Sequence, residues 1–106
     1  MLTIIESPLF SKFWPEYWSE EERGEFALYL ASNPGAGALV PGSGGCRKIR
    51  WTRAGSGKRG GVRVIYTTRL ARGAVVLLVI YAKSTRDSIP GHVLRRIAEE
   101  MGDATE

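Results

Sequence analysis

The sequence predicts an α+β domain, with helices at both ends of the chain and a small antiparallel sheet between them. Helical spacing of apolar residues occupies 8–32 and 88–101, and β-branched strand patterns occupy 46–51, 62–67 and 75–80. Strands that are grouped in the sequence and flanked by helices are typical of α+β folds, not of alternating α/β folds. With 106 residues the chain has room for one domain, spanning 1–106, and not for a second.

The first third of the chain predicts an edge strand followed by a helix that breaks early. Leu2–Ile5 is a short apolar stretch of the kind found in edge strands. Ser7 followed by Pro8 is typical of an N-cap and a first helical residue. Pro15 interrupts the helical spacing of an aromatic face, so we expect a break or kink near Trp14.

A second helix is predicted from the capping box that Ser19 and Glu22 can form, and an Asn-Pro-Gly run ends it. Phe26, Tyr29 and Leu30 share one face of this helix. Because the aromatic residues of both helices recur at helical spacing and lie far from the basic block described next, we expect them to form core or a surface that faces a partner.

Charge is unevenly distributed along the chain. The segment from Phe26 to Arg86 contains no Asp or Glu, yet it carries eleven of the fifteen Lys and Arg residues. Such a block attracts polyanions and can neutralise phosphates. It contains no carboxylate that could act as a base or hold a metal, so we expect neither a metal site nor a cofactor. Its chemistry must come from Lys, Arg, Tyr and backbone groups.

Cysteine usage and hydropathy favour the cytoplasm. Cys46 is the only cysteine, which excludes an internal disulfide and suits a reducing compartment. The first six residues lack a signal-peptide pattern, and the longest apolar run, 74–82, is too short to cross a membrane as a helix. We therefore expect a cytoplasmic protein without a membrane partner.

The glycine-rich stretch between the first two predicted strands does not predict a nucleotide site. Gly55, Gly57 and Gly60 match the spacing GxGxxG, but a strand pattern follows where that motif needs a helix. We interpret the glycine-rich stretch instead as a connection between two antiparallel strands. Lys58 and Arg59 in this loop could grip a phosphate or could simply be solvated, and their charge leaves both interpretations open.

Alternation along the strands places basic side chains on one face. In 46–51 the buried face must carry Ile49 and Trp51, which leaves Lys48 and Arg50 on the other. If the three strands pair in order, a single patch gathers Lys48, Arg50, Arg63, Tyr81 and Lys83. These residues could instead be ordinary solvent-facing strand residues. Both interpretations stay open, although like charges gathered without an acid should repel unless they bind something.

The chain ends in a further predicted helix. Ser88 and Pro90 form a start signal, and an apolar stripe runs through 93–101. We expect this helix to pack on the sheet, or to serve as a removable arm that packs on a partner. His92, in its first turn, is interpreted as a surface residue because the sequence identifies no partner for it.

Three motifs, in order along the chain, resemble the RelE/HigB family of bacterial toxins in the RelE/ParE superfamily. They are the segments 41–51, 57–66 and 81–83. The resemblance implies helices packed on a small, twisted antiparallel sheet. It also implies a type II toxin–antitoxin toxin that enters the ribosomal A site, contacts ribosomal RNA and cuts mRNA there. A co-expressed cognate antitoxin would hold it inactive.

The resemblance assigns functional positions on the predicted strands. The catalytic residues would be Arg63, Tyr81, Lys83, Lys48 and Arg50. Further basic side chains are predicted to contact RNA or the ribosome: Arg47, Arg53, Lys58, Arg59, Arg69 and Arg86.

A metal-independent route fits these residue types. The ribose 2′-hydroxyl of RNA can attack its own adjacent phosphate, so the protein must supply cations for the phosphorane and a group that moves protons. We assign charge stabilisation to Arg63 and Arg50. Lys83 or Lys48 would accept the proton, and Tyr81 would stack on a base or protonate the leaving oxygen.

Two other functions remain open. ParE-like toxins share this fold and bind DNA gyrase instead of cutting RNA, so fold alone cannot decide the function. A non-catalytic RNA-binding module would also use a basic patch. The basic face together with Tyr81 and Lys83 favours the nuclease.

Overall fold

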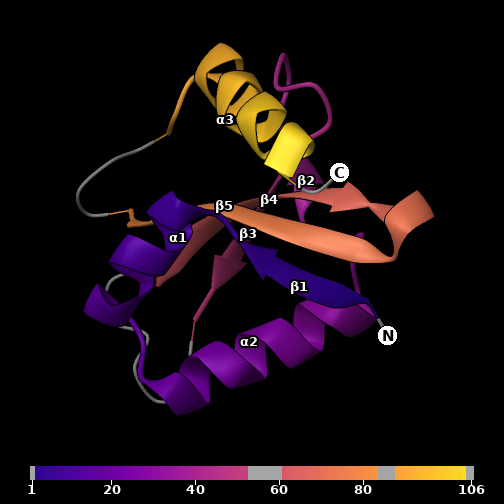
Figure 1. The fold of residues 1–106 in the computed structure, drawn as a ribbon. Coiled ribbons are helices and arrows are strands. Elements are labelled where there is room, and N and C mark those ends of the chain that lie inside the picture. The colour runs from indigo at the N-terminus through magenta and orange to yellow at the C-terminus, as the bar shows by residue number, and fades with distance from the viewer. Residues whose placement is uncertain (1, 53–60, 84–87, 105–106) are drawn as a thin grey trace.

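The computed structural model describes residues 2–52, 61–83 and 88–104, with side chains up to Met101 (Figure 1). It confirms the α+β class. In chain order the elements are β1 (Thr3–Glu6), α1 (Pro8–Phe13), the 3₁₀ helix η1 (Trp14–Glu16), α2 (Glu20–Ser32), β2 (Ala38–Leu39), β3 (Arg47–Trp51), β4 (Val62–Arg69), the 3₁₀ helix η2 (Leu70–Arg72), β5 (Ala74–Ala82) and α3 (Gly91–Ala104). None of the helices in these described ranges is long and apolar enough to cross a bilayer.

The strands form one sheet in the order β1-β5-β4-β3-β2. The pairs β2–β3, β3–β4 and β4–β5 are antiparallel, as the sequence predicts, and β1 adds a parallel edge beside β5. Parallel neighbours need a long connection. Here that connection contains α1, α2, the two 3₁₀ helices and the other three strands, so no local turn signal in the sequence predicts the pairing.

The helix boundaries follow the sequence signals. The Ser7 side chain caps α1 by accepting a hydrogen bond from the Phe10 N–H, and Pro8 is the first helical residue. α1 ends at Phe13 and η1 begins at Trp14, one residue before Pro15, so the predicted break lies where expected. Ser19 and Glu22 form the predicted capping box at the start of α2.

The sheet is covered on both faces, as Figure 1 shows, with α2 on one side and α3 on the other. The core on the α2 side includes Phe10, Trp18, Phe26, Leu30, Ile49, Val62, Val64, Tyr66, Val75, Leu77 and Ile80. The core on the α3 side includes Cys46, Ile65, Val76, Leu78, Val79, Tyr81, Leu94 and Met101. β5 is therefore buried on both faces, as its unbroken apolar run predicts.

A β-bulge interrupts the pairing of β4 with β5. Tyr66 pairs with Leu77, but the preceding Ile65 pairs with Val79, so Leu78 has no partner in β4. The consecutive residues Leu78 and Val79 both pack in the core on the α3 side. The bulge therefore reverses the alternation of β5 and puts Tyr81 on the α3 side of the sheet.

Candidate active site

Three of the predicted catalytic residues form one row across three strands. Arg50 in β3 is the Cα partner of Arg63 in β4, and Arg63 is the partner of Tyr81 in β5. Side chains at directly paired positions project from the same face of a sheet, with Cβ atoms about 4.5–5.5 Å apart. The predicted order of strand pairing is confirmed, and it brings two guanidinium groups and a phenol together on the α3 side.

Lys48 lies beside this row. It is two residues before Arg50 on β3 and pairs with Ile65, so its side chain shares the same face. Arg50 is exposed, Lys48 and Arg63 are half-buried, and Tyr81 is 5% exposed. Three basic side chains with solvent access thus lie on the strands next to the largely buried ring of Tyr81.

Lys83 is the fifth predicted catalytic residue. It follows the last residue of β5 directly and its side chain is exposed. It therefore lies just past the strand end that carries Tyr81, outside the paired part of the sheet.

A cavity of about 310 Å³ adjoins the row. Its floor is formed by Lys48, Ile65 and Tyr81 of the sheet. The walls come from Val40, Pro41, Ser88, Ile89, Pro90, Gly91 and Leu94. The mixture of apolar walls and a few polar groups is typical of small-ligand pockets, and its size lies at the lower end of their range of about 300–1,000 Å³.

The close approach of α3 to the turn after β2 closes one side of this cavity. Gly91 is the first residue of α3, and a Cβ atom there would collide with the carbonyl oxygen of Pro41. Only glycine permits this approach. The wall residues Val40 and Leu94 carry no chemical signature in the sequence, so sequence reasoning did not identify them as part of the site.

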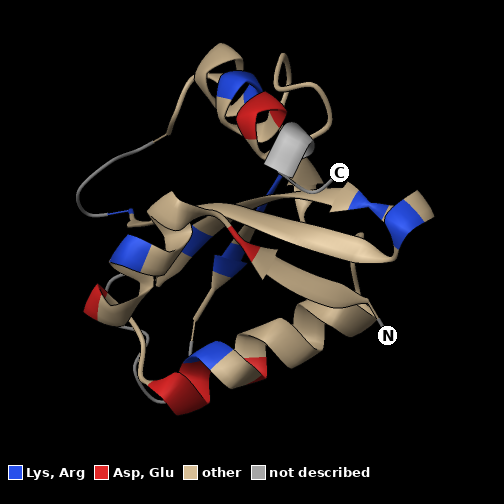
Figure 2. Cartoon of the chain, in the orientation of Figure 1, with Lys and Arg blue, Asp and Glu red and all other residues tan. Residues whose placement is uncertain are grey.

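The charge distribution in space follows the distribution in the sequence. β3, β4 and β5 contain no Asp or Glu. In Figure 2 acidic positions mark the end of β1, the region of α2 and α3, whereas basic positions lie on β3 and β4 and also on the three α-helices. The row therefore sits on three strands that carry no acid, where a phosphate can make charge-assisted and bidentate hydrogen bonds to Arg50 and Arg63.

Two of the predicted RNA-contacting residues lie away from the row. Arg47 projects to the opposite face, where its Nη1 donates to the carbonyl oxygens of Gly37 at 2.6 Å and Gly35 at 3.5 Å. Arg69 lies at the far end of β4, and its Nη2 donates to the carbonyl oxygen of Ala98 in α3 at 3.1 Å. These three bonds tie neighbouring segments together.

The other four predicted RNA-contacting residues fall outside the described ranges. They are Arg53, Lys58, Arg59 and Arg86.

Tyr66 is a structural residue near the site that the sequence did not single out. Its hydroxyl accepts from the Gly37 N–H and donates to the Pro34 carbonyl oxygen, both at 2.8 Å. A Cβ on Gly37 would lie 2.9 Å from the Lys48 carbonyl oxygen and from this hydroxyl. Burial raises the pKa of Tyr66 above its ordinary value. The tyrosine fixes the α2–β2 connection against the strand that carries Lys48.

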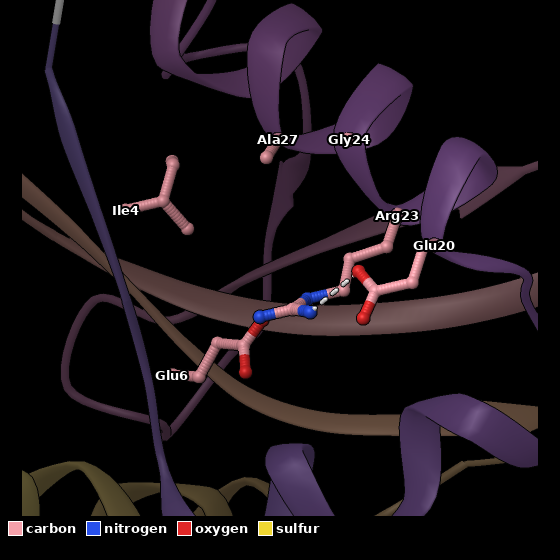
Figure 3. A pocket seen from close by; sticks show the side chains of 6 residues that line it. All are labelled: Ile4, Glu6, Glu20, Arg23, Gly24 and Ala27. Carbon is pink, nitrogen blue, oxygen red and sulfur yellow. Dashed lines mark hydrogen bonds and ion pairs between the residues drawn. The ribbon is translucent and has the colours of Figure 1, made fainter.

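A second hollow, of about 460 Å³, lies between β1 and α2 (Figure 3). Arg23 extends from α2 between two carboxylates, with Nε 2.7 Å from Glu6 Oε2 and Nη1 3.0 Å from Glu20 Oε1. Its guanidinium also lies 4.4 Å from the centre of the Trp14 ring. The hydrogen bond to Glu6 raises the pKa of Arg23 above its ordinary value. These groups satisfy one another, so the hollow is a structural ion-pair site that joins α2 to β1.

No family model matches the sequence. Solved structures of Escherichia coli proteins do resemble the fold, each with a TM-score of 0.59. A free double-arginine mutant of the toxin RelE is 16% identical, over 81% of this chain and 87% of that chain. The intact RelBE toxin–antitoxin complex matches at 16% identity over 77% and 96%, and isolated RelE at 14% over 95% and 99%. The chain therefore has the fold of the RelE toxin.

Proposed function

We propose that the chain is the toxin of a type II toxin–antitoxin system and acts as a ribosome-dependent mRNA endoribonuclease in the cytoplasm. The observation that carries the proposal is the row Arg50–Arg63–Tyr81, with Lys48 beside it, on a sheet whose strands β3 to β5 have no acid. The likeness to the RelE fold supports the same class of function.

The proposed reaction uses the RNA's own nucleophile. The 2′-oxygen attacks the adjacent phosphorus while its proton passes to the amine of Lys48, which lines the cavity beside Tyr81. The bond from phosphorus to the 5′-oxygen breaks, and that oxygen takes a proton from the Tyr81 hydroxyl. The products are a 2′,3′-cyclic phosphate and a 5′-hydroxyl.

Arg50 and Arg63 stabilise the charge that develops on the phosphorane. A guanidinium can bind two phosphate oxygens at once, and two of them at paired strand positions can hold one phosphate from adjacent sides. The strands that carry the row offer Lys, Arg and Tyr and no carboxylate, the ligand type that binds Mg²⁺. The residue set therefore supports a route through the 2′-hydroxyl that requires no metal.

The cavity next to the row has room for one nucleobase. Tyr81 and Lys48 line it together with apolar walls, so a base next to the scissile phosphate can enter while the phosphate stays at the arginines. Arg69, which lies away from the row, and the basic residues of the glycine-rich loop would add separate contacts to the RNA backbone or the ribosome.

Expression in cells followed by mapping of RNA 5′ ends tests this function. New 5′ ends inside translated codons, absent with an Arg63→Ala variant that still folds, are the expected result. DNA damage without RNA cuts would instead indicate a gyrase inhibitor of the ParE type. RNA binding without either lesion would indicate a non-catalytic RNA-binding module. Both of the last two outcomes contradict the proposal.

An antitoxin is part of the proposal. A toxin with this basic sheet needs a partner with an acidic or apolar segment that covers the row or prevents entry into the ribosome, and the RelBE complex supports such a partner. Purification of the chain at its native expression level should recover the antitoxin bound to it. Recovery of the chain alone would contradict this part of the proposal.

A further inference from the structure

We infer that Ser7 is a positioning residue for the proposed active site, because it holds the bulge that turns Tyr81 toward Arg63. Ser7 lies 71 positions before Leu78, to which its side chain is bonded. The inference rests on the proposed function, since it assigns to Tyr81 a role in RNA cleavage. It adds a residue from β1–α1 that neither touches the RNA nor lies in the basic segment.

The bulge leaves two successive carbonyl groups of β5 on the same edge. In a regular strand successive carbonyls point to opposite neighbours. Here the carbonyl oxygens of Leu77 and Leu78 both turn away from β4 and toward Ser7. The Ser7 N–H donates to the first at 2.9 Å, and the Ser7 hydroxyl donates to the second at 2.8 Å.

Ser7 is buried, and its hydroxyl both donates and accepts a hydrogen bond. Its residue exposure is 2%, and its Oγ also accepts the Phe10 N–H at 3.0 Å, which starts α1. One hydroxyl therefore caps the helix and satisfies the carbonyl that the bulge removes from the ladder. Leu78 itself is fully buried, so water is not available to replace this donor.

Removal of the hydroxyl would leave the Leu78 carbonyl oxygen buried without a partner. If β5 loses the bulge and continues the regular register from the Tyr66–Leu77 pair, the Leu78 carbonyl oxygen regains a partner in the sheet. Arg63 would then pair with Ile80 in place of Tyr81, and a shift by one residue moves a side chain to the other face. Tyr81 would point toward α2, away from the arginine row.

The helix cap of α2 provides a matched control. Ser19 caps α2 through its hydroxyl, as Ser7 caps α1, but it is exposed and lies away from β5. Glycine is nearly as good as serine at an N-cap. The variants Ser7→Gly and Ser19→Gly therefore both preserve a helix start, and only the first removes the donor to the bulge.

The test compares these variants with the wild type by RNA cleavage and by NMR. For Ser7→Gly we expect cleavage to fall by about 10²–10⁴-fold, the loss typical of a missing general acid, because Tyr81 leaves the row. We also expect the cross-strand contacts of Arg63 that NMR detects to shift from Tyr81 to Ile80. Ser19→Gly should keep wild-type cleavage and the Arg63–Tyr81 contact.

Two results would overturn the inference: a Ser7→Gly protein that keeps the Arg63–Tyr81 contact, or one that loses activity only as much as Ser19→Gly. If Ser7→Gly does not fold, Ser7→Cys, which keeps nearly the same side-chain shape with a much weaker hydrogen-bond donor, allows the same comparison against Ser19→Cys. A wild-type chain that fails to cut RNA contradicts the proposed function instead. In that case the NMR comparison still decides whether Ser7 holds the bulge. The role of Ser7 in positioning Tyr81 for cleavage is then rejected, because there is no cleavage.

Discussion

Arg50 and Arg63 are direct Cα partners across β3 and β4, so two guanidinium groups project side by side from one face of the sheet. A phosphate placed between the two groups gains charge-assisted hydrogen bonds from both. This pair is therefore the part of the molecule best suited to stabilise a charged phosphorane.

Replacement of Arg63 should remove catalysis while leaving the fold. For Arg63→Ala we expect cleavage by ribosomes programmed with mRNA to fall by about 10²–10³-fold, as when one charge-stabilising donor is lost. Arg63→Lys keeps the charge but loses the planar fork and should recover only part of the rate. Arg95→Ala, on the exposed face of α3, serves as the control with an unchanged rate. Equal rates for Arg63→Ala and the control would contradict the role of Arg63.

The phenol of Tyr81 can be tested separately from its ring. Tyr81→Phe preserves the aromatic face but removes the hydroxyl, so a role as general acid predicts a fall of about 10²–10⁴-fold in the cleavage rate. Single-turnover cleavage on ribosomes measures this step. A rate within about twofold of the wild type would remove Tyr81 as the proton donor and leave it as a stacking residue.

The cavity beside the row should influence which base is accepted. Val40→Phe narrows the cavity with a larger side chain, so we expect the distribution of cut sites to shift toward smaller bases, with purine positions losing most. Leu39→Phe changes the adjacent residue, which is 61% exposed and does not line the cavity. Mapping of 5′ ends for both variants gives the comparison. Identical cut-site profiles would show that the cavity does not receive a base.

The buried thiol of Cys46 should make stability fall at alkaline pH. Burial raises its pKa above the ordinary value of 9.0, so the folded state keeps the proton at a pH where the unfolded state loses it. The stabilisation is complete below the unfolded pKa and is lost as pH rises through the folded one. Denaturant unfolding at about pH 8 and about pH 10 measures the loss.

Cys46→Ala is the control for that experiment. The alanine variant is less stable at each pH because it leaves a cavity, but it lacks the thiol that titrates. Its free energy of unfolding should therefore fall less than that of the wild type over the same pH interval. An equal decrease in the two proteins would show that Cys46 does not contribute.

The sequence predicted those parts of the fold that local signals determine. The capping residues Ser7 and Ser19 and the break at Pro15 act within one or two helical turns, and all three lie where expected. The hairpin between β4 and β5 follows from its turn, in which Gly73 adopts a positive φ of 68°. Alternation also predicted that Ile49 would be buried.

The features of the fold that the sequence could not predict depend on contacts between residues that are far apart in the chain. The bulge at Leu78 leaves no mark in an unbroken apolar run, yet it determines the face on which Tyr81 lies. The parallel pairing of β1 with β5 joins strands far apart in the chain, and β2 has only two residues. Alternation already puts Arg47 on the opposite face from the row, but its bonds to the Gly35 and Gly37 carbonyl oxygens join segments that are distant in the sequence.

The central claim is that the arginine row promotes attack by the RNA's own 2′-hydroxyl on the adjacent phosphate. The most direct measurement uses ribosomes programmed with two mRNAs that differ only by a 2′-deoxy sugar at the mapped cut site. We expect the all-ribose mRNA to be cut to a 2′,3′-cyclic phosphate and a 5′-hydroxyl, and the deoxy mRNA to remain intact at that position. Equal cleavage of both mRNAs would contradict this claim.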